Sequence, residues 1–226
     1  MKQMKKLYLL LLLVCAQMFS QTEISKTLGE FSEIKVYDLI NVDLIKSTEN
    51  KIVISGKNSE NLNIIQKNNT LKLKMQLKKK FNGKETQVKL YYTSLDIIDA
   101  NQGAVVFSKG SIKQYELVLK AQEGAQIKAD VDTKLLVVKS VTGAKVLTTG
   151  RSNQQDVNIR TGGVYKGANI TAENTDLDIK FGGEADVNTS NVLDVAIFSG
   201  GDVNIFGTPK QLKQRKIFGG RILFKD

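Results

Sequence analysis

The sequence contains neither histidine nor tryptophan, and its 226 residues include one cysteine (Cys15) and one proline (Pro209). Without histidine there can be no Ser-His-Asp triad, no Cys-His pair and no His-ligated metal site. These absences exclude most hydrolase chemistry, and we expect no metal and no other cofactor. Since 41% of the residues are hydrophobic and 25% are charged, the chain has the composition of a folded protein and not of a disordered one.

The first 20 residues have the pattern of a secretory signal peptide. Lys2, Lys5 and Lys6 precede an uncharged apolar run over residues 7–14. Spanning a membrane takes about 20 apolar residues, so this run is too short for that, but it suits the apolar region of a signal peptide. We expect cleavage just before Gln21. The mature protein would then lie in the periplasm, on the outer-membrane surface or outside the cell, with no transmembrane span.

A lipoprotein signal is the alternative, because Cys15 directly follows the apolar run and could be acylated. Val14 stands where such a signal has a small residue, so cleavage before Gln21 is the preferred interpretation. A chain cleaved there has no cysteine and folds without disulfide bonds. It loses three of 33 basic residues and none of 23 acidic ones, which leaves a formal net charge of +7.

Pairs of small residues recur along the last 130 residues, with first members 18 to 21 residues apart. The pairs are Gly103-Ala104, Gly124-Ala125, Gly143-Ala144, Gly162-Gly163, Gly182-Gly183, Gly200-Gly201 and Gly219-Gly220. Short strand-like runs precede the pairs, and apolar and polar residues alternate after them. Each interval has room for two short strands and two turns. Such units bury their apolar side only against neighbouring copies, as in a β-solenoid.

We therefore predict an all-β fold, a single-stranded right-handed parallel β-helix (β-solenoid) with coils of about 19 residues. The glycine pairs would lie at one corner of every coil, where φ is positive or where neighbouring coils approach closely. We expect a single domain over residues 21–226, with irregular opening strands at 21–94, regular coils at 95–207 and a C-terminal cap at 208–226. The opening strands could be first coils or an antiparallel meander that caps the solenoid.

The opening strands and the coils together resemble a known family. The motifs that carry the resemblance are Phe31-x-x-Ile34-x-Val36, Val42-x-Leu44, Ile52-Val53-Ile54, Leu71-x-Leu73, the glycine pairs and Gly207-x-Pro209. Over about residues 31–223 the chain is similar to the head GIN domain of "putative autotransporter adhesins". This resemblance implies a β-helical protein secreted by, or held in the envelope of, Gram-negative bacteria. It implies no catalytic residues, and so a non-enzymatic binding or structural role towards glycan or protein partners.

Two basic segments supply the candidate binding residues, namely Lys78, Lys79, Lys80, Lys213, Arg215 and Lys216. They could bind an anionic glycan, lipopolysaccharide or phosphate. The preferred interpretation is that these cations keep exposed strands and solenoid ends from pairing with other chains. Nucleic acid is not an expected partner, because the protein is exported and aromatic residues do not alternate with basic ones. The sequence does not indicate an oligomeric state.

Two other kinds of site are less favoured. Asp-Val-Asn occurs at residues 156–158, 186–188 and 202–204, which suggests a calcium ladder, but aligning the coils puts Asp186 level with Asn204. A polysaccharide lyase or hydrolase would need paired carboxylates, for which Asp96 with Asp99 and Asp130 with Asp132 are the nearest candidates. The coils lack the long loops that would form a cleft. Seven aromatic residues could stack on sugars, but stacking between coils in the core is their expected role: Tyr91, Tyr92, Phe107, Tyr115, Phe181, Phe198 and Phe206.

Overall fold

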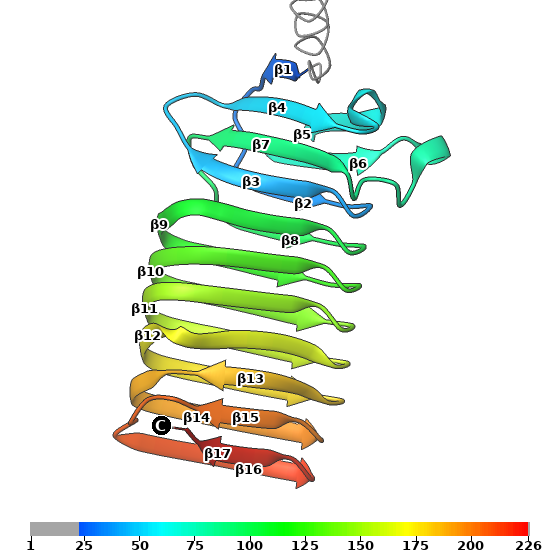
Figure 1. Ribbon diagram of the computed structural model, residues 1–226. Helices are drawn as coiled ribbons and strands as arrows, with labels where there is room; N and C mark the ends of the chain where they lie inside the picture. Colours follow the sequence, from blue (N-terminus) through cyan, green and yellow to red (C-terminus); the bar gives the residue numbers. More distant parts are fainter. Residues whose placement is uncertain (1–22, 226) are drawn as a thin grey trace, which may run out of the picture.

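The computed structural model describes residues 23–225, which wind into an all-β solenoid of about 7 turns with coils about 19 residues apart (Figure 1). The β-solenoid predicted from the glycine pairs is thus confirmed. The expected signal peptide, residues 1–20 with Cys15, lies outside the described residues. In the part of the chain from residue 23 to residue 225, no helix is long and apolar enough to cross a membrane.

Seventeen strands and two short 3₁₀ helices follow one another within residues 23–225. They are β1 (Ile24–Thr27), β2 (Glu33–Val36), β3 (Asn41–Lys46), β4 (Lys51–Gly56), η1 (Ser59–Asn61), β5 (Leu62–Lys67), β6 (Thr70–Met75), η2 (Leu77–Lys79), β7 (Thr86–Tyr92), β8 (Ile97–Ala100), β9 (Val105–Ala121), β10 (Gln126–Val141), β11 (Lys145–Arg160), β12 (Gly163–Lys180), β13 (Gly183–Val187), β14 (Thr189–Ser199), β15 (Asp202–Ile205), β16 (Gln211–Phe218) and β17 (Arg221–Phe224).

Each regular coil is built from strand that bends midway and pairs in parallel with the coils on both sides. The first halves of β9 to β12 pair with one another, and β13, β15 and β17 extend this stack towards the C-terminal end. The second halves pair in the same way, and β14 and β16 extend their stack. Inward side chains stack in columns, one of which consists of Val138, Val157, Leu177 and Val195. Because all four are buried, every coil closes the apolar core of the next.

The two members of a glycine pair meet different requirements at the corner. Thr142 and Gly143 have φ values of 52° and 68°, so two successive left-handed residues make the tight turn. A Cβ on Gly143 would meet nothing within 4 Å, and glycine therefore serves conformation there. The next position touches the neighbouring coil, since a Cβ on Gly163 would lie 2.1 Å from the carbonyl oxygen of Ser140. Both reasons expected from the sequence are found.

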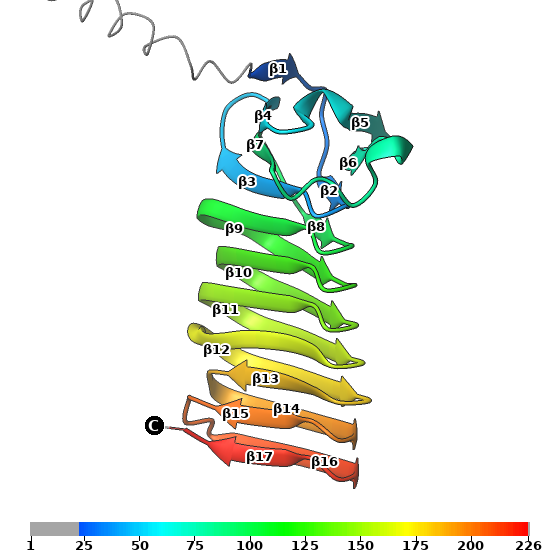
Figure 2. The ribbon, with the colours of Figure 1, turned by 45° about the vertical axis from the view of Figure 1, so that its right-hand side comes forward.

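The opening strands combine the two arrangements that the sequence left open. β2 and β3 form a coil that lies between β6 and β7 on one side and β8 and β9 on the other, all in parallel. Above β6 and β7, strands β5 and β4 pair with them antiparallel, and β1 pairs with β4. After β3 the chain thus forms β4 to β7 on the N-terminal side of the β2–β3 coil, and it passes to the other side of that coil at β8 (Figure 2). The antiparallel strands cover the N-terminal end of the core.

At the opposite end, β16 and β17 stack in register on β14 and β15 as one more coil. Regular pairing therefore continues past residue 207, where we expected a cap to begin. Lys216 occupies an inward position, in register with the buried Ile197. A charge at such a position hinders the addition of another coil from a second molecule. Phe218 and Phe224 on this last coil are exposed.

Candidate functional site

The stack of coils is interrupted between β6 and β7 by residues 76–85, which we call the lysine loop. It is the longest connection between two strands in the part of the chain that the structure describes. Gly83 fixes the loop against the corner of the β2–β3 coil, where its N–H donates to the carbonyl oxygen of Asp38 over 3.1 Å. A Cβ at Gly83 would lie 2.4 Å from that oxygen, so the approach requires glycine.

The lysine loop presents both charge and apolar surface to solvent. Lys78, Lys80 and Lys84 are exposed, and Lys79 is half-buried. Leu77 and Phe81 are 87% and 51% exposed, and the Lys80 ammonium lies 4.9 Å from the centre of the Phe81 ring. Phe81 has a φ of 62°, a conformation that costs energy for a bulky residue and that is typical of binding segments. Two large apolar side chains are thus exposed beside lysines on this loop.

A cavity of about 420 Å³, which we call the corner cavity, lies on one side of this loop. It is lined by Tyr37, Asp38, Asn63, Lys72, Lys74, Met75, Leu77, Lys80 and Gln102. The Lys72 ammonium lies 5.8 Å from the centre of the Tyr37 ring. Burial, together with the nearby Asp99 carboxylate, raises the pKa of Tyr37, so that its hydroxyl stays protonated. The cavity thus combines three ammonium groups, one carboxylate, two amides and an aromatic ring.

A second cavity, of about 540 Å³, lies against other residues of the lysine loop. It is lined by Leu39, Lys57, Asn58, Lys79, Phe81, Asn82, Lys84 and Glu85. Two of these lining residues, Lys57 and Glu85, form an ion pair of 3.4 Å. The lysine loop therefore contributes to the walls of two cavities, with lysines facing both.

The structure does not bring the two basic segments together. Lys213, Arg215 and Lys216 lie on β16, which is separated from β6 by the strands β2, β8, β9, β10, β11, β12 and β14. Eight strand spacings of about 4.8 Å place β16 roughly 40 Å from β6. Lys213 is in register with Asp194, and Arg215 lies 3.9 Å from the same carboxylate. Within residues 23–225, by contrast, Lys78, Lys79 and Lys80 form no ion pair.

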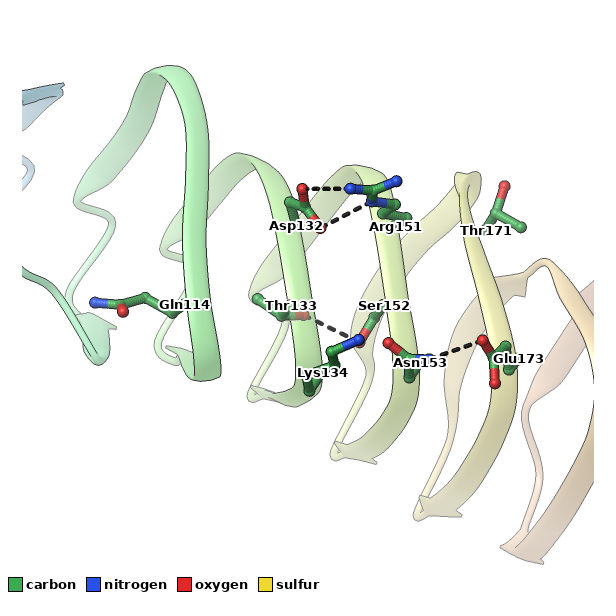
Figure 3. Close-up of a pocket in the computed structure, with 9 residues that line it drawn as sticks. All are labelled: Gln114, Asp132, Thr133, Lys134, Arg151, Ser152, Asn153, Thr171 and Glu173. Atoms are coloured by element: carbon green, nitrogen blue, oxygen red, sulfur yellow. Dashed lines mark hydrogen bonds and ion pairs between the residues drawn. The ribbon is translucent and has the colours of Figure 1, made fainter.

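A third cavity, of about 460 Å³, follows the bends of β9 to β12 and is called the bend groove (Figure 3). Its polar side chains pair with one another from coil to coil. Arg151 donates two hydrogen bonds of 2.8 Å to Asp132, and Asn153 donates one of 2.7 Å to Glu173 (Figure 3). Arg151 also lowers the pKa of the Asp132 carboxyl, so this carboxylate stays ionised. These mutual contacts leave fewer groups free for a ligand than in the corner cavity.

The acidic pairs considered for catalysis have structural partners. Asp99 is buried and accepts a hydrogen bond of 2.9 Å from Asn101, while Asp130 accepts one of 2.9 Å from Thr149. Asp96 accepts a longer one of 3.2 Å from Gln114. A general acid needs a raised pKa, whereas the pKa of Asp132 is lowered. Asp132 is therefore not suited to act as a general acid.

Asp186 and Asn204 face each other in register and are hydrogen-bonded over 2.8 Å, so the Asp-Val-Asn triplets are out of step as the coil alignment indicated. The sequence reasoning missed a different ladder, in which Asp156, Asp176 and Asp194 are in register on the outer surface. Aligning the second strand of each coil, instead of the triplets, would have found it. In the described part of the chain, no group of three or more such acidic or cysteine side chains is arranged to hold a metal ion.

Core stacking was the wrong expectation for four of the seven aromatic residues. Of the seven, only Tyr92 is buried, and Tyr91 and Phe107 are half-buried. The other four, Tyr115, Phe181, Phe198 and Phe206, are between 37% and 78% exposed. Phe181 is the first left-handed residue of a corner, from which its side chain cannot enter the core. Phe198 packs edge-to-face on both Phe181 and Phe218, with centroids 5.6 Å apart in each pair. These rings stack between coils on the outside of the solenoid.

Comparisons with solved structures reproduce the fold at low sequence identity. A "putative adhesin" from Bacteroides fragilis is 18% identical with a TM-score of 0.84, covering 91% of this chain and 97% of that one. A "putative adhesin" from Parabacteroides distasonis is 15% identical with a TM-score of 0.71, covering 91% and 97%. A "putative lipid binding protein" from Parabacteroides distasonis is 13% identical with a TM-score of 0.70, covering 91% and 96%. No curated protein matches the chain.

The family comparison covers most of the chain. Residues 30–209 match the family described as "Putative auto-transporter adhesin, head GIN domain". This match includes the opening strands from β2 onward, the lysine loop and all coils down to β15. On the strength of this match and of its coiled fold, the chain belongs to the head GIN domain family of "putative auto-transporter adhesins".

Proposed function

We propose that this chain is a non-enzymatic, exported envelope protein that binds an anionic glycan through its lysine loop. The observation that carries the proposal is the loop itself, where Leu77 and Phe81 are exposed beside lysines that form no ion pair within residues 23–225. Ammonium groups attract carboxylate or phosphate, and exposed apolar and aromatic surface packs on the apolar faces of sugar rings. The adhesin names given to the family and to its structural neighbours support a binding role at the cell surface.

The lysine loop is favoured over the second basic segment for two reasons. Lys213 and Arg215 lie beside Asp194, which offsets part of their charge. They also belong to the final coil, where cations discourage edge-to-edge association, so a structural role accounts for them. The lysine loop does not lie on a sheet edge, and loops carry a large share of binding functions.

Carbohydrate cleavage is the alternative function. A panel of polysaccharides distinguishes it from binding, because cleavage releases oligosaccharide and binding does not. Against it stand the lowered pKa of Asp132 and the hydrogen bonds that hold Asp99 and Asp130. Purified protein can be tested on a panel of anionic and neutral polysaccharides, with both binding and product release measured. We expect binding of anionic members without released oligosaccharide. Release at catalytic turnover would overturn the non-enzymatic proposal, and absence of all binding would overturn the glycan proposal.

Export is part of the proposal and has a separate test. The intact mass of the protein isolated from its native envelope should correspond to a chain that begins at Gln21. A chain that begins at an acylated Cys15 would indicate a lipid-anchored protein instead of one cleaved before Gln21. A chain that retains Met1 would contradict export.

A further inference from the structure

The corner cavity contains a buried carboxylate whose hydrogen-bonding capacity is only half used. Asp38 is 4% exposed, and its Oδ2 accepts a hydrogen bond of 3.1 Å from the backbone N–H of Met75. Among the residues that the structure describes, none donates a hydrogen bond to Oδ1 of Asp38. A buried carboxylate oxygen without a donor costs folding free energy, and such atoms are rare in folded proteins. It is therefore a position where a ligand that brings a hydroxyl group is favoured.

The rest of the cavity favours a negative charge on the same ligand. Lys72 and Lys74 extend outward from β6, and Lys80 reaches the cavity from the lysine loop. Tyr37 adds an aromatic ring, on which the C–H face of a sugar can pack. Asn63 and Gln102 add amides that both donate and accept hydrogen bonds. A simple anion such as phosphate would use the lysines but would be repelled by Asp38.

From these contacts we propose that the corner cavity is a subsite for one sugar residue that carries an anionic group, with Asp38 accepting a hydrogen bond from a sugar hydroxyl. The anionic group, a carboxylate or a phosphate, pairs with Lys72, Lys74 and Lys80. This inference rests on the proposed glycan-binding function and assigns to it a position and a sugar class. Because Oδ1 of Asp38 is covered, binding includes movement of rim side chains, of which Leu77 and Lys80 are exposed.

Asp38→Asn is the decisive substitution, because it separates hydrogen bonding from charge. Asparagine tolerates the positive φ of 58° at this position, and its carbonyl oxygen can keep the bond to Met75. The amide group then meets the sugar with a donor in place of an acceptor. The variant also removes a negative charge, which by electrostatics alone would strengthen the binding of any anion. The proposal and a purely electrostatic patch therefore predict opposite signs.

Calorimetric titrations would use digalacturonic acid, galactose 6-phosphate, neutral galactobiose and inorganic phosphate. We expect one or both anionic sugars to bind at least about tenfold more tightly than galactobiose and phosphate, and their relative affinity identifies the anionic group. Asp38→Asn should weaken that sugar by about tenfold or more, since a hydrogen bond to a charged group is lost. Asp178→Asn, which removes an equal charge from the outer surface of β12, is the control and should change the affinity less than about twofold.

Unchanged or tighter binding of the anionic sugar by Asp38→Asn would overturn the subsite, as would phosphate binding as tightly as the sugar. Melting temperatures verify that the variant is folded. If it is not, Lys72→Gln replaces it, and it should weaken the anionic sugars severalfold while galactobiose binding is unaffected. If the wild type binds no acidic polysaccharide, the proposed function fails as well. If acidic polysaccharide binds equally to wild type and Asp38→Asn, only the subsite fails.

Discussion

Arg221 on the last coil donates hydrogen bonds of 2.7 and 2.6 Å to the two carboxylate oxygens of Asp202 on the coil before it. Arg151 and Asp132 form the same bidentate contact in the middle of the solenoid, with bonds of 2.8 Å. In both pairs the partners are in register on adjacent parallel strands. Bidentate contacts of this kind are the stronger and geometrically more specific ion pairs, so they help to fix one coil on the next.

The contact between Arg221 and Asp202 should make stability depend on pH. Arg221 lowers the pKa of Asp202 below its ordinary value of 3.8. Its stabilising contribution is therefore complete above pH 3.8 and is lost as the pH falls through the lowered folded-state pKa. Arg221→Gln should reduce the melting temperature at pH 6, and the difference from wild type should shrink towards pH 2. The control is Arg160→Gln, at the exposed last residue of β11. A melting-temperature difference between Arg221→Gln and wild type that does not change with pH would contradict this account.

The Asp156–Asp176–Asp194 ladder should have the opposite pH dependence. Burial and the neighbouring carboxylates, Asp194 first among them, raise the pKa of Asp176 above 3.8. The native state therefore holds this proton more tightly, and stability falls as the pH rises through that window. Asp176→Asn should stabilise the protein at pH 7 by about 0.5 kcal/mol, because like charges on adjacent strands destabilise a sheet. Urea unfolding at pH 7 and pH 3 checks this, since the gain should be absent at pH 3.

Three glycine substitutions distinguish the two requirements at the corners. Gly143→Ala should cost about 1 kcal/mol, because φ is positive there but the space is open. Gly143→Asn should cost less, since asparagine tolerates this conformation. Gly163→Ala should cost about 3 kcal/mol or more, because its Cβ would overlap the Ser140 carbonyl oxygen of the preceding coil. Denaturant unfolding gives these values, and equal costs for the two alanine variants would contradict the assignment.

A buried polar network inside the solenoid should be sensitive to the loss of one hydroxyl. The Tyr165 hydroxyl lies 2.8 Å from the Thr148 hydroxyl and donates to the side-chain oxygen of Gln155 over 2.9 Å. Tyr165→Phe should destabilise the protein by about 1–3 kcal/mol, since it leaves buried polar atoms without partners. The control is Tyr115→Phe at an exposed position, which should lie within about 0.5 kcal/mol of wild type. A near-neutral Tyr165→Phe would contradict the role of this network.

The regular coils could be predicted from the sequence because their contacts repeat at a fixed separation. Glycine is required at position 143 by the local backbone conformation and at position 163 by the approach of one neighbouring coil. Since these requirements recur in every coil, the period can be read from the sequence alone. The register of Asp186 with Asn204 also follows from this period and is found in the structure. It failed for Phe181 and Phe198, because alternation along a strand does not tell an outward aromatic ladder from a core one.

The corner cavity could not be predicted, because its residues come from segments that the chain order separates. Asn63, Lys72 and Gln102 meet there only because the β2–β3 coil is placed between β6–β7 and β8–β9. Because neighbouring coils in this region are not consecutive in the chain, their contacts leave no fixed period in the sequence. Lys78, Lys79 and Lys80 were recognised in the sequence as a basic segment, but the position of the lysine loop beside Asp38 depends on the contact of Gly83 with the corner.

The most direct test of the account compares two triple variants for binding of polygalacturonate at one fixed salt concentration. Lys78→Ala/Lys79→Ala/Lys80→Ala and Lys213→Ala/Arg215→Ala/Lys216→Ala remove the same number of positive charges from opposite ends of the solenoid. We predict that the lysine-loop variant loses affinity by about tenfold or more, equal to about 1.4 kcal/mol, and that the other variant stays within about twofold of wild type. Equal losses in both variants, or a larger loss in the second, would contradict a glycan site at the lysine loop.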